Sequence, residues 1–250
     1  MAHYDFYAEK KISSPGAWIN RIAAEKCAKL FLSFLLDRFP SPAVAGTRPS
    51  VLEIGPGRGL FASHLIKTGS VEYKGYEPEK KLFDALKAQG INVVSTMVPP
   101  IPEDNECFSA SAAMNVLEHM PTVQTAEKLL QEMYRVIKPA GFVFIVVPSY
   151  LDWGREYFNL DYTHQTIMTE SRLRQMLNDA GFRLLRMTYH YGCFFSGFGR
   201  IPNALARASR LILSVLLPRS LARSDTLQKM GILFAENIIC CAEKMPPENL

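Results

Sequence analysis

The chain has 250 residues, of which 48% are hydrophobic and 21% charged, and its formal net charge is +4. This length predicts one sizeable core with appendages and is short for two, and the composition excludes a low-complexity chain. The charge points to no particular partner, because a nucleic-acid-binding domain more often carries a dense basic patch.

The first expected element is an amphipathic helix or helix pair at residues 17–39, where apolar residues recur at helical spacing. The Pro/Gly/Ser-rich stretch 40–50 is typical of a linker. After it, short apolar runs alternate with helical patterns. Strands are expected at 50–55, 71–78, 91–96, 107–117 and 142–149, and helices at 60–69, 79–90 and 122–137.

The C-terminal part adds a helix at 170–181 and strands at 182–190 and 237–244. Strands separated by helices of about three turns indicate right-handed crossovers and a parallel sheet. We therefore expect an α/β fold with a Rossmann-like, doubly wound, mostly parallel sheet and an antiparallel edge strand. It also has an N-terminal helical cap and a helical insertion before the last strand.

The expected division of the chain places an N-terminal helical cap or lid at 1–48 and the main domain at 49–250. The helical insertion falls at about 193–232. Tyr4, Phe6 and Tyr7 are candidates for a lid over a ligand, with a frayed terminus as the alternative.

The stretch VLEIGPGRG, residues 51–59, ends the first expected strand of the main domain and opens a helix. In a doubly wound sheet, ligands bind where the strand order reverses, over the carboxyl ends of the strands. A dinucleotide fingerprint would require a third glycine at position 60, which is Leu60, and a phosphate loop would require Gly-Lys-Ser/Thr. Both phosphate-binding interpretations are therefore disfavoured.

The remaining pattern is an acid followed by alternating glycines: Glu53, Gly55, Gly57 and Gly59. Glycine lets the backbone approach a ligand, free N–H groups suit a carboxylate, and the acid suits an ammonium group. Glu77 ends the next strand, where a carboxylate can accept hydrogen bonds from ribose hydroxyls. A nucleoside joined to an amino acid satisfies both requirements, which predicts S-adenosyl-L-methionine.

From about residue 49 to residue 148 the chain resembles the class I S-adenosylmethionine-dependent methyltransferases, with weaker similarity to residue 186 and at the last strand. The matching pieces are VLEIGPGRG, GYEP, AMNVLEHMP and IKPAGFVFIVVPS, in which Ala140 replaces a glycine of the family pattern. DYTHQTIMTESRLRQMLNDAGF resembles the branch that includes quinone, glycan-modifying and natural-product methyltransferases.

The resemblance implies cofactor contacts along two strand ends. The Gly55–Gly57 turn, with Pro56, would hold the methionine moiety, and Glu77 the ribose. Further expected contacts are Pro78 beside the adenosine, Met97 near adenine, and the backbone of Asn115, Val116 and Leu117 along the methionine. Many relatives carry an acid after the third strand, whereas this chain has Ser95, Thr96 and Met97, which makes the adenine contact less well defined.

His119 and His164 are the candidate catalytic groups. His119 follows the fourth strand of the expected sheet and should face the cleft, as a base or an acceptor-positioning group, or else pack against the helix start. His164 lies in DYTH, in a loop that caps such clefts, with Asp161 and Tyr162 as orienting partners. The alternative is a loop-packing histidine.

The segment 199–223 contains five arginines and no acid. On a helical wheel its arginines lie opposite an apolar face, a pattern typical of a helix on a membrane surface or beside a lipid-like acceptor. The alternative is an inserted helix packing over the acceptor pocket. The apolar face comprises Ile201, Leu205, Ala208, Ile212, Val215 and Leu216.

The five cysteines are odd in number, and no pair has the two-residue spacer of a metal or redox motif. The sequence therefore predicts no metal site and a reduced compartment. MAHYDFYAEKK lacks the apolar run of a signal peptide, and no stretch approaches the roughly 18 uninterrupted apolar residues of a membrane span. We expect a cytoplasmic protein in which 199–223 either contacts a membrane surface peripherally or packs over the acceptor pocket.

The predicted function is S-adenosylmethionine-dependent methyl transfer to a small-molecule or lipid/glycan-linked acceptor, with oxygen favoured over nitrogen or carbon. One alternative is a membrane-peripheral binding protein that keeps the fold without catalysis. A second is an NAD-dependent oxidoreductase, against which Leu60 argues. A nucleic-acid acceptor is disfavoured, because NVLE replaces the Asn/Asp-Pro-Pro-aromatic motif.

Overall fold

The structure is a computed structural model that describes residues 17–39, 47–195, 197–218 and 233–245. A seven-stranded sheet forms its centre, with the strand order β3-β2-β1-β4-β5-β7-β6. The strands are β1 (Ser50–Ile54), β2 (Glu72–Tyr76), β3 (Val93–Val94), β4 (Phe108–Met114), β5 (Ile137–Pro148), β6 (Phe182–Tyr191) and β7 (Glu236–Lys244).

Strands β1 to β5 are parallel, and the register pairs Ile54 of β1 with Tyr76 of β2 and with Ala113 of β4. β7 runs antiparallel to both β5 and the edge strand β6, which confirms the expected antiparallel pairing at this edge. The strand order reverses between β1 and β4. The glycine turn that follows β1 therefore lies at the point where ligands bind in sheets of this kind.

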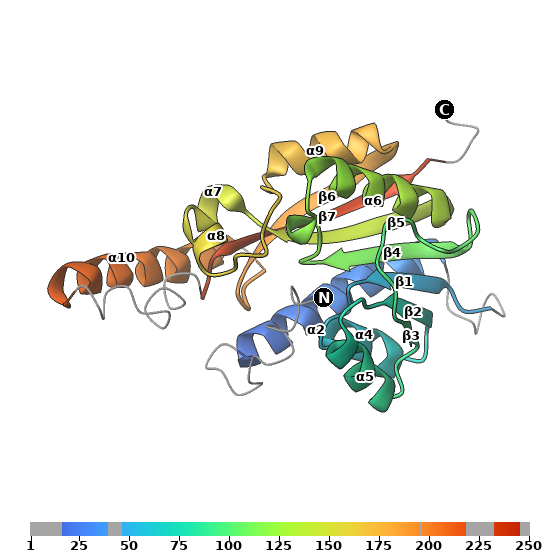
Figure 1. Ribbon diagram of the computed structural model, residues 1–250, viewed down its shortest axis with the longest axis horizontal. Coiled ribbons are helices and arrows are strands. Elements are labelled where there is room, and N and C mark those ends of the chain that lie inside the picture. Colours follow the sequence, from blue (N-terminus) through green and yellow to red (C-terminus); the bar gives the residue numbers. More distant parts are fainter. Residues whose placement is uncertain (1–16, 40–46, 196, 219–232, 246–250) are drawn as a thin grey trace.

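Helices cover both faces of the sheet, as expected for a doubly wound fold (Figure 1). One face carries α2 (Ala17–Arg38), α4 (Leu60–Lys67) and α5 (Lys80–Ala88), and the other carries α6 (Val123–Val136) and α9 (Glu170–Asp179). Polar caps start three of these helices. The side chains of Glu79, Thr122 and Thr169 each accept a hydrogen bond from the backbone N–H three residues later.

Helix α2 belongs to the core of the sheet. Its Phe31 is fully buried and contacts the rings of Phe61 in α4 and of Phe142 and Phe144 in β5, with centroids 5.3 to 5.6 Å apart. Leu35, one turn further on, is also fully buried. The helix that the sequence assigns to a cap is thus a layer against the sheet face. Tyr4, Phe6 and Tyr7 lie outside the described residues.

Two expected strands are shorter in the structure. β4 ends at Met114 because Asn115 takes a left-handed backbone conformation, with φ of 54°, and the chain then enters the short helix η1 (Leu117–His119). In the expected strand 91–96, only Val93 and Val94 pair with β2. Both shortened strands leave irregular backbone at the carboxyl edge of the sheet.

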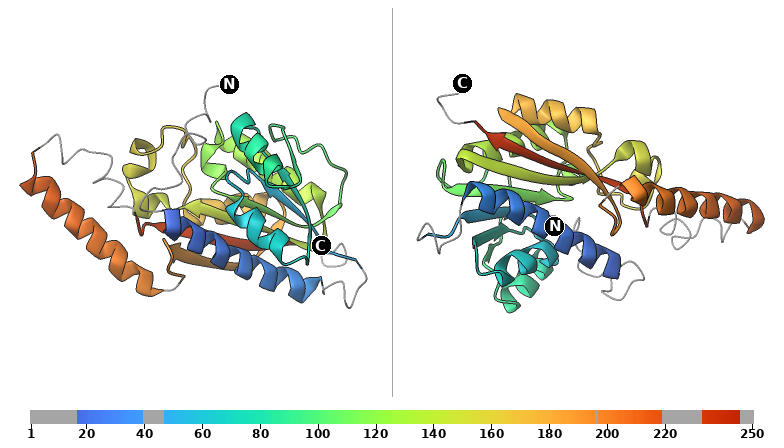
Figure 2. Two further views of the ribbon diagram at one scale, coloured as in Figure 1. Left: turned by 90° about the horizontal axis from the view of Figure 1, so that it is seen from below. Right: turned by 180° about the vertical axis from the view of Figure 1, so that it is seen from behind.

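The remaining helices lie at one end of the sheet (Figure 2). They are α7 (Tyr150–Trp153), α8 (Glu156–Asn159), η2 (Gly197–Gly199) and the inserted α10 (Arg200–Leu216). α10 extends past α7 and α8, away from the sheet (Figure 1). Among the described residues, no helix combines the length and apolar character needed to cross a membrane.

Candidate functional site

The glycine turn, residues 55–59, follows β1, and all three of its glycines have positive φ, between 57° and 70°. This is the left-handed region, which side chains other than glycine's rarely tolerate. A Cβ on Gly55 would lie 2.9 Å from Val116 Cγ2, so the turn packs directly against the end of β4. At Gly57 the nearest atom to an added Cβ would be 4.0 Å away. The turn is therefore close-packed at its start and open at its middle.

Gly59 has a different role from the first two glycines. A Cβ there would lie 2.7 Å from Leu86 Cδ2 and 3.0 Å from Ile91 Cδ1. Pro56 is buried, and its ring packs over Gly75 in β2. These contacts bring α4 close to α5 and hold the turn in shape, so Pro56 and Gly59 support the turn from behind.

Glu77, at the end of β2, connects the turn to the next loop. Its Oε2 accepts a hydrogen bond from Gly57 N–H at 2.8 Å, and its Oε1 accepts one from Glu79 N–H at 3.0 Å. Burial raises the pKa of this carboxyl, while the two backbone hydrogen bonds lower it. A carboxylate has about four acceptor positions, so both oxygens retain capacity for ribose hydroxyls. The arrangement fits the predicted nucleoside contact.

Glu53 lies within the sheet, one residue before the end of β1, with 1% of its surface exposed. Its Oε2 accepts a hydrogen bond from the Tyr73 hydroxyl at 2.6 Å. Burial raises the pKa of Glu53 to about 8, and the nearby Glu77 charge raises it further, against the effect of the Tyr73 hydrogen bond. Glu53 is thus a buried acid whose ionised form would be favoured by a cationic group.

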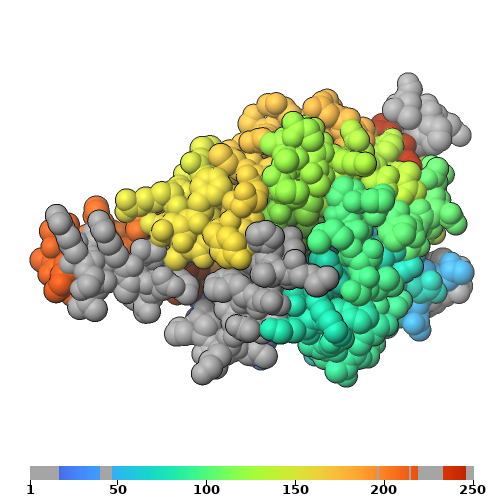
Figure 3. Space-filling view, viewed as in Figure 1, coloured from blue at the N-terminus to red at the C-terminus, as the bar shows by residue number. Residues whose placement is uncertain are grey.

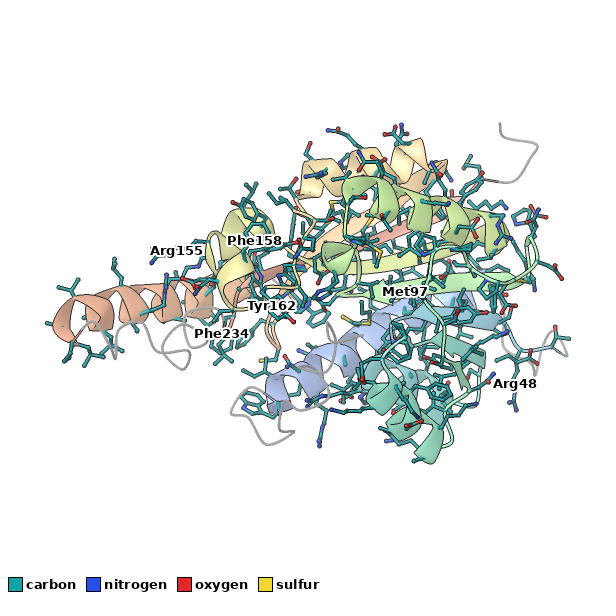
Figure 4. All side chains as sticks on the ribbon, in the orientation of Figure 1. Arg48, Met97, Arg155, Phe158, Tyr162 and Phe234 are labelled. Carbon is teal, nitrogen blue, oxygen red and sulfur yellow. The ribbon has the colours of Figure 1, made fainter. Side chains whose placement is uncertain are left out.

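The other expected cofactor contacts surround this turn. Met97 exposes 59% of its surface on the loop after β3, so an apolar side chain is available to cover a base (Figure 4). Pro78 is partly buried, and Asn115 is exposed beside the buried Val116. Leu117 is fully buried in the core, which leaves only its backbone for a ligand. The predicted residues therefore lie on β1 and on the segments that follow β1, β2, β3 and β4, along the carboxyl edge of the sheet, an arrangement that fits an amino-acid-bearing nucleoside.

The segment 161–168 is bound to η1 by backbone hydrogen bonds. The N–H groups of Gln165 and Thr166 donate to the Glu118 carbonyl at 2.8 and 3.0 Å, and the Thr166 hydroxyl donates to the Met120 carbonyl at 2.8 Å. As a result the rings of His119 and His164 lie 4.7 Å apart between centroids. The structure thus brings together the two histidines proposed from sequence as catalytic groups.

Hydrogen bonds from the loop and from α8 orient both rings. Asp161 Oδ1 accepts a hydrogen bond from the Thr163 hydroxyl at 2.6 Å, and the same hydroxyl lies 2.9 Å from His119 Nδ1. His164 Nδ1 lies 2.6 Å from the Tyr157 carbonyl oxygen. Asp161 therefore orients His119 through Thr163, and its backbone carbonyl accepts a hydrogen bond from the His164 N–H at 3.2 Å. Tyr162 exposes 58% of its surface on the same loop (Figure 4).

Glu118 is the functional candidate that the sequence reasoning missed. It is fully buried beside His119, and its Oε1 accepts a hydrogen bond from Asn115 Nδ2 at 3.1 Å. Burial raises its pKa to about 8, although hydrogen bonds with its own backbone and Asn115 lower it. An acid between apolar residues in NVLEHM was the available signal, because an acid in such a run is seldom buried without a partner.

Other histidines lie elsewhere. His64 is on α4, and His190 packs its ring on Phe195 with Nδ1 3.0 Å from the Gly192 carbonyl. Burial lowers the pKa of His190 to about 4, so it is a neutral core residue at neutral pH. Neither residue belongs to the site described above.

Comparison with known proteins places these features in context. The profile of a family described as "Methyltransferase domain" matches residues 19–186. The mitochondrial ubiquinone biosynthesis O-methyltransferase of Rattus norvegicus is 30% identical over 116 residues, which are 42% of this chain and 32% of that protein. The tRNA (carboxymethyluridine(34)-5-O)-methyltransferase of Arabidopsis thaliana is 29% identical over 112 residues, 45% of this chain and 26% of that protein. The matched regions thus span about a third or less of these relatives.

Solved structures share the fold at low sequence identity. A SAM-dependent methyltransferase from Archaeoglobus fulgidus has a TM-score of 0.61 at 18% identity, with 97% of this chain and 100% of that chain covered. The [4+2]-cyclase SpnF also scores 0.61, at 17% identity, over 88% of this chain and 80% of that chain. A Haemonchus contortus phosphoethanolamine N-methyltransferase, solved with S-adenosylhomocysteine, scores 0.58 at 15% identity over 98% and 56%.

Proposed function

The chain belongs to the methyltransferase domain family, and on this premise we propose that it transfers a methyl group from S-adenosylmethionine to an oxygen of a small or lipid-linked acceptor. The observation that carries the proposal is the glycine turn hydrogen-bonded to Glu77 at the β1–β4 switch point. That geometry provides an open backbone at Gly57 and a buried carboxylate 20 residues later, the two features that a nucleoside joined to an amino acid requires.

S-adenosylmethionine supplies a methyl group on a sulfonium, which is already activated for displacement. The acceptor oxygen forms the new C–O bond with its lone pair, the electron pair of the C–S bond remains on sulfur, and the hydroxyl proton leaves to a base. The protein's main tasks are then to align acceptor and donor and to exclude water. The loop 161–168, bound to η1, is positioned beside the switch point for both tasks.

Two observations support oxygen as the methylated atom. Both curated relatives described above are named for O-methylation. In addition, His119 and His164 lie together beside η1, where a hydroxyl acceptor would need a base or a positioning group. An amine would need such a group less, because the lone pair of a neutral amine nitrogen is more nucleophilic than that of a neutral hydroxyl oxygen.

The direct test is calorimetric titration of the protein with S-adenosylhomocysteine, with NAD as the competing cofactor. We expect binding of S-adenosylhomocysteine and no heat from NAD. The absence of S-adenosylhomocysteine binding, or tighter binding of NAD, overturns the cofactor assignment. A second experiment incubates the protein with labelled donor and paired phenol and amine acceptors of equal size. Transfer to amines alone overturns the oxygen preference.

The insertion α10 supports an acceptor presented at a membrane. Its arginines turn toward the body of the protein: Arg207 pairs with Asp152 at 3.1 Å and Arg210 with Glu156 at 2.7 Å. The opposite, apolar face is exposed, and the α10 region projects from the body of the molecule (Figure 3). Its large residues, Ile201, Leu205, Ile212, Val215 and Leu216, are each 57% to 77% exposed.

This arrangement argues against the sequence-based alternative in which the helix packs over the acceptor pocket, since the apolar face available for packing is exposed and α10 extends away from the sheet (Figure 1). An exposed apolar stripe on a segment with five arginines and no acid matches an anionic lipid surface. We propose that the protein acts in the cytoplasm, at the membrane surface. Its five cysteines are free thiols, which suits a reducing compartment.

Vesicle co-sedimentation tests the membrane contact, with phosphatidylcholine vesicles that contain or lack phosphatidylglycerol. Leu205→Glu places a carboxylate on the apolar face, and Ser209→Glu places the same charge on the exposed flank of α10. We expect Leu205→Glu to weaken binding about tenfold and Ser209→Glu to leave most of it, because burial of a leucine contributes about 1.5–3 kcal/mol. Equal binding of the two variants overturns the assignment. The assignment is also overturned if the protein forms a dimer and Leu205→Glu dissociates that dimer.

If the wild-type protein binds vesicles and S-adenosylhomocysteine but transfers no methyl group to any acceptor, the non-catalytic membrane-binding alternative is supported. The exposed apolar face of α10 is the observation that supports this alternative.

A further inference from the structure

Three side chains with metal-ligating atoms meet beside η1. Glu118 and His119 come from η1, and His164 comes from the loop before α9. One ligand atom from each lies within 4.8 Å of the other two. The three residues are called the histidine cluster below. No sequence spacing predicts this cluster, because His164 lies 45 residues after His119.

Hydrogen bonding determines which nitrogen His164 offers to the cluster. Its Nδ1 lies 2.6 Å from the Tyr157 carbonyl oxygen, and a carbonyl can only accept. Nδ1 therefore carries the proton. In the neutral ring, the lone pair is then on Nε2. The Tyr157 carbonyl thus prepares Nε2 of His164 as a ligand atom.

His119 is prepared in the same way by a hydroxyl and a carboxylate. The Thr163 hydroxyl donates its proton to Asp161 Oδ1 at 2.6 Å, so it accepts from His119 Nδ1 at 2.9 Å. Nδ1 again carries the proton and Nε2 the lone pair. A carboxylate that orients a histidine through its second nitrogen is the usual support of a metal-binding imidazole, because it fixes the ring and raises its basicity.

Glu118 supplies the charged member of the cluster. Its side chain is fully buried, and while Oε1 accepts from Asn115, Oε2 has no hydrogen-bond partner among the described residues. Its backbone carbonyl accepts from Gln165 and Thr166, which holds the residue against the histidine loop. A buried carboxylate oxygen without a donor is costly, and a cation beside it would remove that cost.

We propose that Glu118, His119 and His164 bind one divalent transition-metal ion, with Zn²⁺ as the best fit. Two imidazole nitrogens and one carboxylate oxygen are a donor set typical of zinc, whereas Mg²⁺ prefers oxygen ligands throughout. Three protein ligands leave a coordination position open. The cluster adjoins Asn115, which follows β4, the neighbour of the strand that ends in the glycine turn, so the cluster lies beside the expected cofactor site.

The role of the ion rests on the proposed function. Coordination would hold the acceptor hydroxyl in line with the donor and lower the pKa of the hydroxyl, so that its proton leaves to solvent while the ion itself is unchanged. This role would use the three clustered side chains together, instead of one of the two histidines as a general base.

Metal binding is tested on the 250-residue protein, without acceptor or turnover. The protein is dialysed against a chelator, and Zn²⁺ is titrated by calorimetry, with Co²⁺ absorption as an independent readout of nitrogen and oxygen ligation. We expect one equivalent of Zn²⁺ and a Co²⁺ spectrum that Zn²⁺ displaces. We expect His164→Gln and Glu118→Gln each to weaken Zn²⁺ binding at least about tenfold.

The matched control is His64→Gln, which removes a histidine on α4 outside the cluster and should leave Zn²⁺ binding unchanged. Thr163→Val tests the support of His119 and should weaken binding less than loss of a ligand. Titration with S-adenosylhomocysteine shows that each variant is folded and tests the proposed function separately. Zn²⁺ binding that is equal in His164→Gln and His64→Gln, or absent from the wild type, overturns the metal site even when S-adenosylhomocysteine binds.

Discussion

The glycine turn and the histidine cluster follow the neighbouring strands β1 and β4, but they are held in different ways. The turn is built from backbone groups, and its defining contact joins Gly57 N–H to Glu77. The cluster is built from side chains of two segments, each oriented by a third residue such as Tyr157 or Thr163. The turn depends on the backbone of one short segment and on one carboxylate, whereas the cluster depends on the fold of two segments that are distant in sequence.

The largest expected effect tests the backbone site. Glu77→Ala removes the acceptor for Gly57 and Glu79 N–H and for the ribose hydroxyls. Because hydrogen bonds to a charged group contribute about 1.5–3 kcal/mol each, we expect S-adenosylhomocysteine binding to weaken about hundredfold or more. Calorimetry measures the effect, with Glu72→Ala, an exposed acid on β2, as the control. Similar affinities for the two variants would show that the turn alone holds the cofactor.

The next effect concerns Glu53, the buried acid on the strand that leads into the glycine turn. The pKa of Glu53 is raised to about 8 in the folded protein, above the usual value of a glutamate, so the folded state holds a proton that the unfolded state releases. The free energy of unfolding should therefore fall as pH rises from about 5 to about 8, by on the order of 3 kcal/mol from this group.

Glu53→Gln removes that titration and keeps an acceptor for Tyr73. We expect its advantage over the wild type, measured by urea unfolding, to be larger at pH 8.5 than at pH 5. If the free energy of unfolding depends on pH in the same way in both proteins, Glu53 is not the group responsible for that dependence.

Close packing behind the turn gives the third effect. Gly59→Ala puts a Cβ 2.7 Å from Leu86 at a φ of 70°, while Gly69→Ala meets a similar φ of 64° with no atom within 4 Å. We expect losses of about 2 and about 1 kcal/mol in the free energy of unfolding. The difference, from chemical denaturation, isolates the packing of α4 against α5. No difference would mean that the turn is loosely supported.

A smaller effect tests how α10 is anchored to the helices that precede the histidine loop. Arg210→Ala leaves Glu156 without one of its partners, and the Glu156 side chain is only 5% exposed. We expect a loss of about 1–2 kcal/mol, against about 0.3–0.5 kcal/mol for Arg174→Ala, which breaks an exposed pair with Glu170. Equal losses in urea unfolding would show that the inward arginine does not hold α10 in place.

The smallest effect is a gain. Ala140 has a φ of 62°, where the family pattern has glycine. Ala140→Gly relieves the left-handed backbone at some cost in unfolded-state entropy, so we expect a net stabilisation of about 0.5 kcal/mol. Ala85→Gly on the exposed side of α5 should instead destabilise by about 1 kcal/mol. A destabilising Ala140→Gly would contradict the strain at this turn.

The local patterns of the chain predicted most of the sheet. The alternation of strands and helices is a short-range pattern. The three glycines of 55–59 and Glu77 also lie close together in sequence, so their spacing was enough to predict their arrangement. The helix at 17–39 was also predicted, but not its place, because periodicity reports an apolar face and not what covers it. Only the structure puts Phe31 against β5 rather than over the cleft.

For α10 and the histidine cluster, local sequence patterns predicted the elements but not their arrangement. The helical wheel of α10 separated arginines from apolar residues, but it does not show which face points inward. Hydrogen bonds from α10 to Asp152 and Glu156, more than 50 residues earlier in the chain, determine that orientation. Likewise, His119 and His164 were chosen singly as bases, and Glu118 was overlooked. Their proximity arises because the chain returns to η1 after β5, α7 and α8, a long-range event that no local pattern records.

The sequence by itself therefore determined the fold family and the cofactor turn, since both depend on backbone conformation and short-range spacing. The tertiary structure alone decided the orientation of α10, the tautomers of the two histidines and the meeting of Glu118 with His164. These features depend on hydrogen bonds and ion pairs between distant segments, whose strength is set by burial and geometry that exist only in the folded chain.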